Sequence, residues 1–433
     1  MFVEESEKML ESCLLPQSVF DITERPIEAA HFTEYRKHLE YLLPNLFDVI
    51  SSREIELFEA VPETQKFRKL FVEFVCEQTG DCDFFRTEVE ALRRNLEGFQ
   101  GKIKKMLNDD EKLKREMMLL YKSKLIGEEW KRNFGAIHGF LQFCRILYSN
   151  QRDSLDLDQG MFILSIGTQF LENVDPAFKL QGLKLLSLLL ECMDEDLLRE
   201  TNTHEVIYTQ MRENVEKILD QECTQEIWKC IWLAVKLDKR LSNDLEWNKI
   251  DDCLQTLIYK LKTESNPGTR RFLQEILLQF VSFTVSDRES FEVSWNSENN
   301  HKLLNDLKLK SITFDNIKCY RWTKSLLDMF VGQFLTIVSS REEAIRTIRF
   351  VHLAYLLTIS TIQRQLLDEA LAEFIKRIVP ISAEICNNYR NVDSSVQEEI
   401  LSFLQTVHRQ SQEKPNGNNC FIALGRFLSH AAA

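Results

Sequence analysis

Apolar residues recur every three or four positions through almost the whole chain, the spacing that one face of an α-helix requires. The pattern is strongest over Trp130–Tyr148 and over two neighbouring segments, 157–172 and 176–193. Residues 81–126 carry more charge and predict one or two longer helices with a break near Gly98–Gly101, because glycine weakens a helix interior. The chain is therefore predicted to be all-α.

Several predicted helices begin at a residue suited to cap them. Asp175 can accept a hydrogen bond from the first turn, and Pro176 fits the first helical position. Comparable starts lie near residues 224, 266, 341 and 393. HEAT and armadillo repeats have a period of about 40–47 residues, which these starts follow loosely. We predict an irregular helical N-terminal region over residues 1–150. HEAT-like helical hairpins would follow over 151–433 as an α-solenoid, a right-handed superhelix.

The longest interval between helix starts contains a polar segment. Residues 286–320 are rich in Asn and Ser and poorly periodic, and we predict a loop insertion with at most a short helix near 303–309. We expect residues 286–311 to be dispensable for folding, since lengthening a loop costs little. A last short helix over 421–430 would cap the array.

Composition supports helices and disfavours nucleic acid as a partner. Only 13 Gly and 8 Pro occur in 433 residues, too few for the frequent turns of a large all-β fold. The net charge is −13, whereas a phosphate-binding protein is usually basic. The basic stretch Arg93–Arg132 is better explained as a solvated helical face with ion pairs.

The 11 cysteines include no C-x-x-C pair, and many lie in apolar helical patterns. They are expected to be buried thiols of a reducing compartment. The N-terminus shows no secretory pattern, and the most apolar stretch, Phe350–Ile359, is too short to span a membrane. We expect a cytoplasmic protein, with the nucleus as a second compartment and no membrane partner.

The sequence lacks the common motifs of enzymes and of phosphate-binding proteins. The sequence contains no phosphate-binding loop, no H-E-x-x-H and no G-x-S-x-G. Pairs of potential metal ligands lack further ligands nearby, and acidic clusters are best explained as helix ends and solvated faces. The pairs are His31 with His38, Cys76 with Cys82 and Cys223 with Cys230; the clusters are Glu4, Glu5, Glu7 and Glu11, and Asp194–Asp196. No cofactor, metal or catalytic residue is expected.

One segment follows the pattern D-P-x-φ-[RK]-x-x-[AG]-x-x-x-L of HEAT repeats. Its residues are Asp175, Pro176, Phe178, Lys179, Gly182 and Leu186. Weaker copies retain Asn266, Pro267 and Arg270, and then Asp393 and Val396. Gly182 predicts a close approach of another helix, at which leucine would destabilise the fold and alanine would be tolerated.

Three segments together resemble a specific family. Asp175–Leu186, Asn266–Val281 and Arg321–Leu335, in this order and spacing, are similar to the second Tel-two-interacting protein family. The resemblance covers roughly residues 130–410, and the segment 286–312 departs from it. It implies an all-helical, non-enzymatic subunit of the TTT co-chaperone complex. The partners implied are the first Tel-two-interacting protein and Tel-two. The role implied is folding and stability of phosphatidylinositol-3-kinase-related kinases with the ninety-kilodalton heat-shock chaperone.

The aromatic residues Trp322, Phe330 and Phe334 share one predicted helix. They are expected to line the core between repeats, and they are also the candidate partner interface of a hetero-oligomer, because aromatics are enriched at interfaces. Two other classes of function stay open. The first is a HEAT-type transport or trafficking adaptor, and the second is a helical enzyme without a recognisable motif.

Overall fold

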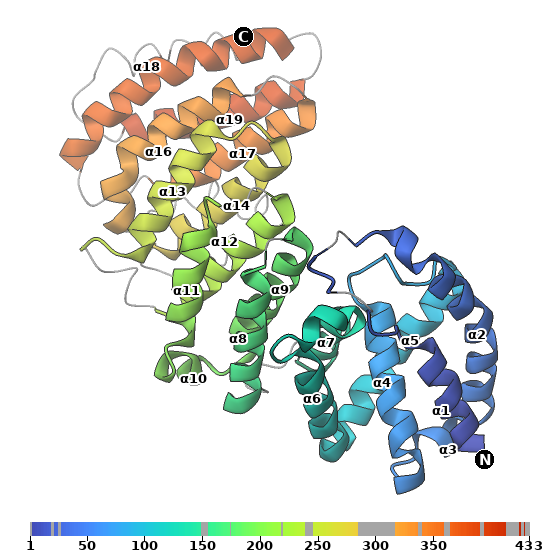
Figure 1. Cartoon of the computed structure of the whole chain (residues 1–433). Helices are drawn as coiled ribbons and strands as arrows, with labels where there is room; N and C mark the ends of the chain where they lie inside the picture. The colour runs from blue at the N-terminus through green and yellow to red at the C-terminus, as the bar shows by residue number, and fades with distance from the viewer. Residues whose placement is uncertain are drawn as a thin grey trace. The chain divides into compact units, whose positions relative to one another are not determined.

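The computed structural model describes most of the chain. Outside its description lie residues 1, 19–20, 25–26, 149–154, 174, 218–219, 239–245, 285–316, 337–339, 359–363, 390–393, 413–423, 426–427 and 429–433, and the side chains of 55, 317–320, 364–369 and 410–412. Two compact units divide the chain, Met1–Leu237 and Asp238–Ala433. In both units the described residues form helices and no strand, so the predicted all-α class is confirmed (Figure 1).

Unit 1 contains twelve described α-helices and three short 3-10 segments. The helices are α1 (Phe2–Cys13), α2 (Thr33–Ser52), α3 (Glu54–Phe58), α4 (Gln65–Thr79), α5 (Glu90–Asp109), α6 (Glu111–Leu125), α7 (Phe134–Tyr148), α8 (Leu157–Leu171), α9 (Pro176–Cys192), α10 (Glu195–Glu200), α11 (Thr203–Asn214) and α12 (Gln221–Lys236). The 3-10 segments are Ala29–Phe32, Pro62–Thr64 and Glu129–Arg132.

The helices of unit 1 pack mainly on their neighbours along the chain. α8 and α9 form an antiparallel pair, as do α11 and α12, and the second helices of these pairs, α9 and α12, pack on each other (Figure 1). α7 packs on α9 and also on α4 and α6. The ring of Trp130 lies 5.3 Å from that of Phe170 and 5.5 Å from that of Phe178. These contacts cross residue 150, so the boundary predicted there lies inside unit 1, and the observed boundary follows Leu237.

Unit 2 contains α13 (Lys249–Thr263), α14 (Pro267–Phe283), α16 (Ile317–Leu335), α17 (Arg341–Thr358), α18 (Arg364–Tyr389) and α19 (Ser394–Gln412). These helices pack as three successive pairs: α13 with α14, α16 with α17, and α18 with α19. The first helices of the pairs pack in the order α13, α16, α18, and the second helices in the order α14, α17, α19. Unit 2 therefore has two helical layers, each built from one helix of every pair.

Most predicted helix starts agree with the structure. α9, α14, α17 and α19 begin at or within one residue of the predicted positions. α12 begins at Gln221 and not near 224, because the carboxylate of Asp220 caps it by accepting a hydrogen bond from the Cys223 amide (2.9 Å). Its capping residue is aspartate, as at the best predicted start.

The predicted break near Gly98–Gly101 is wrong. α5 runs through both glycines, and the chain turns at Asp110, whose carboxylate accepts a hydrogen bond from the Leu113 amide (3.0 Å) and so caps α6. Most of the predicted insertion at 286–320 and of the capping helix at 421–430 lies outside the described residues. Among the described helices, none is both long and apolar enough to cross a bilayer.

Candidate functional site

The best repeat motif opens α9. The Asp175 carboxylate accepts a hydrogen bond from the Ala177 amide (2.8 Å), and Pro176 occupies the first turn. Phe178 is buried against the rings of Trp130 and Phe134. The motif therefore fixes where α9 begins and anchors it to the segment before α7. Lys179 is half-buried beside these residues.

Gly182 lies where α9 packs tightly against α8. A Cβ atom at residue 182 would stand 2.5 Å from the carbonyl oxygen of Gly167 and 2.9 Å from the amide nitrogen of Leu171. Leu186, one turn further along α9, is fully buried and faces Gly167. The close approach predicted from the sequence is present. The expectation that alanine would be tolerated is wrong, because the atoms in the way belong to the backbone.

The second motif caps α14 and ties it to the next pair. The Asn266 side chain accepts hydrogen bonds from the amides of Gly268 and Thr269, with Pro267 in the first turn. The Arg270 guanidinium donates to the carbonyl oxygen of Glu264 (3.0 Å) and lies 3.7 Å from a Glu343 carboxylate oxygen on α17. The basic residue of this motif thus binds the chain just before its own helix and the first turn of α17.

In the third motif Val396 is buried in α19, and Asp393 lies outside the described residues. The three motif copies therefore share their position at the start of a helix that belongs to a packed pair.

The candidate interface of aromatic residues belongs to the core of unit 2. Phe330 and Phe334 on α16 are fully or almost fully buried, and their rings lie 6.4 Å from Phe350 and 5.4 Å from Phe403. The Trp322 indole N–H donates to the buried carboxylate of Asp251 (2.9 Å). These aromatics fill the space between neighbouring helices, and little of their surface is left for a partner. Their other expected role, lining the core, agrees with this packing.

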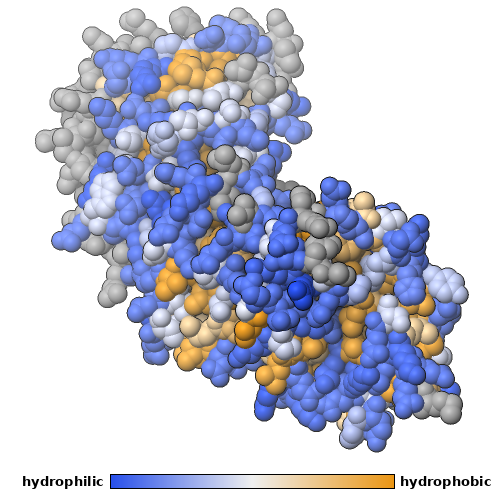
Figure 2. Space-filling view, in the orientation of Figure 1, coloured by the Kyte–Doolittle hydropathy of each residue, from blue (hydrophilic) through white to orange (hydrophobic). Residues whose placement is uncertain are grey.

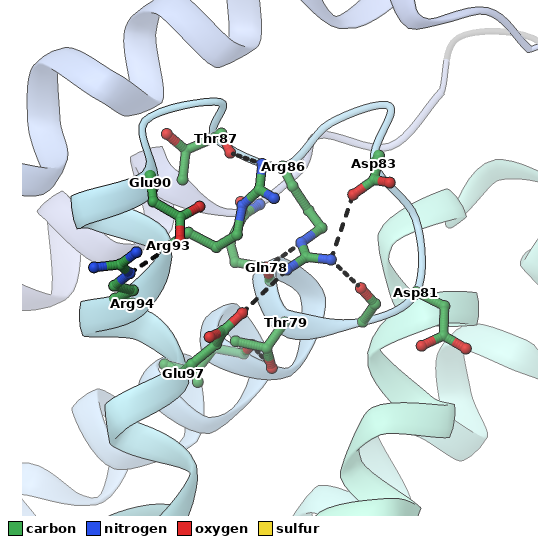
Figure 3. A network of polar contacts seen from close by, with 12 residues as sticks. Gln78, Thr79, Asp81, Asp83, Arg86, Thr87, Glu90, Arg93, Arg94 and Glu97 are labelled. Carbon is green, nitrogen blue, oxygen red and sulfur yellow. Dashed lines mark hydrogen bonds and ion pairs between the residues drawn. The ribbon is translucent and has the colours of Figure 1, made fainter.

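A polar network holds the loop between α4 and α5 (Figure 3). At its centre, the Arg86 guanidinium donates to the carbonyl oxygens of Gln78 (3.0 Å) and Gly80 (3.1 Å), which the end of α4 leaves without helical partners. The carboxylates of Asp83 and Glu97 lie 3.5 and 3.6 Å from the same guanidinium. The loop is therefore fixed to both helices that it connects.

Asp81 in the same loop reaches two further helices. Its carboxylate accepts hydrogen bonds from Arg145 on α7 (2.6 Å) and from Lys184 on α9 (2.7 Å). Burial opposes ionisation of Asp81, but the hydrogen bonds and charges of Arg145 and Lys184 outweigh it and lower its pKa to about 2. One carboxylate thus connects three segments of unit 1.

Glu77 on α4 is a buried carboxylate of unit 1. Its carboxylate is buried against Gly135 and Gly139 of α7, where a Cβ on either glycine would lie within about 3 Å of the Glu77 side chain. It accepts a hydrogen bond from the Leu15 amide (3.2 Å), just after α1. Burial, and secondly the charge of Glu73, raise the pKa of Glu77 to about 8. The contact joins α1, α4 and α7.

The described cysteines are free thiols, and all of them are buried except Cys386, which is half-buried. Burial raises the pKa of Cys13 to about 12 and that of Cys82 to about 11, which keeps these thiols protonated and poorly nucleophilic. His31 and His38 are exposed on unit 1. Within the part of the chain that the structure describes, no group of three potential ligands is placed to hold a metal ion.

The basic stretch Arg93–Arg132 is largely paired, as expected for a solvated helical face. Lys102 pairs with Glu54, Lys124 with Glu73, and Arg94 with Glu90. Arg115 and Lys122 on α6 are exposed and, among the described residues, have no acidic partner.

These two residues border a surface groove between α6 and α8, which we call the α6–α8 groove. It has a volume of about 360 Å³ and is lined by Glu111, Lys114, Arg115, Met118, Leu119, Lys122, Asp156, Asp158, Gln159 and Phe162. Leu119 in its lining is a large apolar side chain that is 59% exposed, and α8 carries two more exposed apolar residues, Met161 (45%) and Leu157 (43%). Figure 2 shows hydrophobic surface over this part of unit 1. Neither the groove nor the burial of Glu77 was predicted from the sequence.

Comparison with known proteins yields no match to the chain, whether to a protein-family model, to a curated protein or to a solved structure.

Proposed function

We propose that the chain is a non-catalytic scaffold built as an α-solenoid of HEAT-like hairpins, and that it acts through protein partners. The observation that supports this most is the order of helices in unit 2, where three pairs stack so that each pair contacts its neighbours in two layers. Stacking of successive helical pairs is the way repeat proteins build extended binding surfaces. Motif copies with the same capping geometry at α9 and α14 agree with a repeated design.

The family resemblance supplies the particular role. On the strength of Asp175–Leu186, Asn266–Val281 and Arg321–Leu335, we assign the chain to the second Tel-two-interacting protein family. It would then be a subunit of the TTT complex, with the first Tel-two-interacting protein and Tel-two as partners. Its function would be to support folding and assembly of phosphatidylinositol-3-kinase-related kinases with the ninety-kilodalton heat-shock chaperone.

The burial of Trp322, Phe330 and Phe334 changes how such a partner would bind. Partner contacts would come from the outer surfaces of the helical layers, and the aromatics would act by keeping neighbouring pairs in register. A partner that binds only the folded chain stabilises it by RT ln(1 + [L]/Kd), about 2.7 kcal/mol at a hundredfold excess over Kd.

Co-expression tests this proposal. The full chain is purified alone and together with the first Tel-two-interacting protein and Tel-two, and the thermal unfolding midpoint is measured for each preparation. We expect a stoichiometric complex with a raised midpoint, and lower levels of the kinases in cells that lack the chain. Co-purification with transport receptors or cargo would favour the adaptor alternative. Absence of a complex, with the midpoint and kinase levels unchanged, would reject the proposal.

A further inference from the structure

The α6–α8 groove combines apolar side chains with charges of opposite sign on its two walls. Met118 is nearly buried and Phe162 half-buried, and they form its apolar floor, whereas Leu119, which also lines the groove, is exposed. An exposed leucine at a groove gains by being covered, and a methionine in its floor adapts its shape to different partners.

The α6 wall is basic. Arg115, Leu119 and Lys122 follow one another at helical spacings of four and three residues, so they share a face of α6. Neither cation pairs with an acidic side chain among the described residues. Lys114, deeper in the wall, already pairs with Glu111 (3.2 Å). The uncompensated positive charge therefore belongs to Arg115 and Lys122.

The α8 wall is acidic. Asp156 and Asp158 stand at the start of α8, where the Asp156 carboxylate accepts a hydrogen bond from the Gln159 amide (2.8 Å) and caps the helix. Asp158 lies exposed in the first turn, without a hydrogen bond or ion pair among the described residues. Asp158 is thus the carboxylate available to an approaching cation.

From these features we infer that the α6–α8 groove binds an amphipathic α-helix of a partner protein, with acidic residues on the edge that faces α6 and basic residues on the edge that faces α8. The α6 wall extends from Glu111 to Lys122, about 17 Å at 1.5 Å per residue, which matches roughly three turns of a bound helix. Apolar residues of the partner at positions i, i+3, i+4 and i+7 would cover Leu119 and the groove floor. The inference goes beyond the proposed function and rests on it only in treating the chain as a partner-binding scaffold.

Three synthetic fluorescent helical peptides test the inference with the full chain. They share one apolar ridge and differ at the edges: the first has Glu on one edge and Lys on the other, the second Glu on both, and the third Lys on both. We expect the Glu/Lys peptide to bind about three- to tenfold more tightly than either of the others in fluorescence anisotropy at low salt. This preference should shrink at high salt.

Variants of the chain assign the binding to the groove. In Arg115→Glu/Lys122→Glu both walls are acidic, so the peptide with Lys on both edges should become the preferred one. The matched control Lys8→Glu/Lys105→Glu changes the net charge equally outside the groove and should keep the wild-type preference. Leu119→Asp should abolish binding of all three peptides, whereas Val206→Asp, at another exposed apolar position of unit 1, should not. Helical circular dichroism and unfolding midpoints verify that each variant is folded.

Several results would overturn the inference. They are equal binding of the three peptides, no binding at all, wild-type binding by Leu119→Asp, or a concentration-dependent dimer in sedimentation that Leu119→Asp abolishes, which would identify a second copy as the occupant. Failure of the scaffold role is distinguishable from failure of the groove. Without that role the chain forms no complex with the Tel-two-interacting partners yet still prefers the Glu/Lys peptide. Without the groove, complex formation is retained and peptide preference is lost.

Discussion

The carbonyl oxygen of Gly167 on α8 occupies the place that a side chain at Gly182 on α9 would need, since a Cβ there would stand 2.5 Å away. Carbon and oxygen atoms that are not bonded do not approach so closely, and a backbone carbonyl moves only if its helix moves. The separation of α8 and α9 therefore leaves no room for a side chain at residue 182. The repeat motif has its small residue at this position.

Gly182→Ala should destabilise unit 1 by about 1–3 kcal/mol, because overpacking outweighs the gain of roughly 1 kcal/mol in helix propensity. Gly182→Leu should cost more. The matched control is Gly98→Ala in α5, where a Cβ meets nothing within 4 Å, and this variant should gain about 0.5–1 kcal/mol. Denaturant midpoints measure all three. A Gly182→Ala variant as stabilised as Gly98→Ala would contradict the packing described here.

The glycine positions show how much of the fold can be predicted from the sequence. Helical periodicity and capping residues predict α8, α9, α14 and α19 closely, because these signals are local. The sequence does not distinguish Gly98, which lies in an open helical face, from Gly182, which lies in a contact, except through the repeat pattern around the latter. The chain divides into compact units after Leu237, and contacts such as Trp130 with Phe178 cross residue 150 and connect segments that are distant along the chain.

The folded chain should lose stability as the pH rises through the range in which Glu77 titrates. Its pKa is raised from about 4.5 to about 8, so between these values the folded state holds a proton that the unfolded state has lost. The free energy of unfolding therefore falls with increasing pH, by up to about 1.4 kcal/mol per pH unit, and the loss is complete above pH 8.

Glu77→Gln removes this dependence and keeps an oxygen for the Leu15 amide. We expect the variant to be close to wild type near pH 5 and more stable than wild type near pH 8, as measured by urea unfolding at a series of pH values. Glu63→Gln, at an exposed position, is the control and should track wild type. Parallel pH curves for Glu77→Gln and wild type would show that Glu77 stays ionised in the folded state.

The link from Asp81 to Lys184 should stabilise unit 1 more than a surface ion pair does. A double-mutant cycle with Asp81→Asn and Lys184→Met should give a coupling of about 0.5–2 kcal/mol at neutral pH. The exposed pair Glu90–Arg94 should give only about 0.3–0.5 kcal/mol. Because the pKa of Asp81 is lowered from 3.8 to about 2, its contribution is present above pH 3.8 and disappears as the pH falls toward 2. Equal coupling in the two cycles would mean that the Asp81 contacts add nothing beyond screened surface charge.

The elements of the candidate site were less predictable than the helices for a physical reason. Glu77 lies in an amphipathic helix, in which a carboxylate is normally expected to be exposed. Only Gly135 and Gly139 of α7, four residues apart, indicate that a side chain of another helix occupies the space beside them. The α6–α8 groove depends on how two helices that are not consecutive along the chain lie side by side, and helical periodicity does not encode this. Conversely, Trp322 and Phe334 are of residue types that are enriched at interfaces, but both side chains are buried in unit 2.

Thiol labelling should report whether the two units unfold together. Cys230 on α12 and Cys253 on α13 are both fully buried, one in each unit, so under native conditions at neutral pH neither should react with N-ethylmaleimide unless its unit opens. Half-buried Cys386, whose pKa burial raises to about 11, should react sooner but still more slowly than in urea. Peptide mapping by mass spectrometry follows each site over time.

Equal labelling rates at Cys230 and Cys253 across a urea series would indicate one cooperative unfolding step, as expected when neighbouring helical pairs stabilise each other. Faster labelling of Cys253 would show that unit 2 opens while unit 1 is folded, and early labelling of both in native buffer would contradict the burial of these helices.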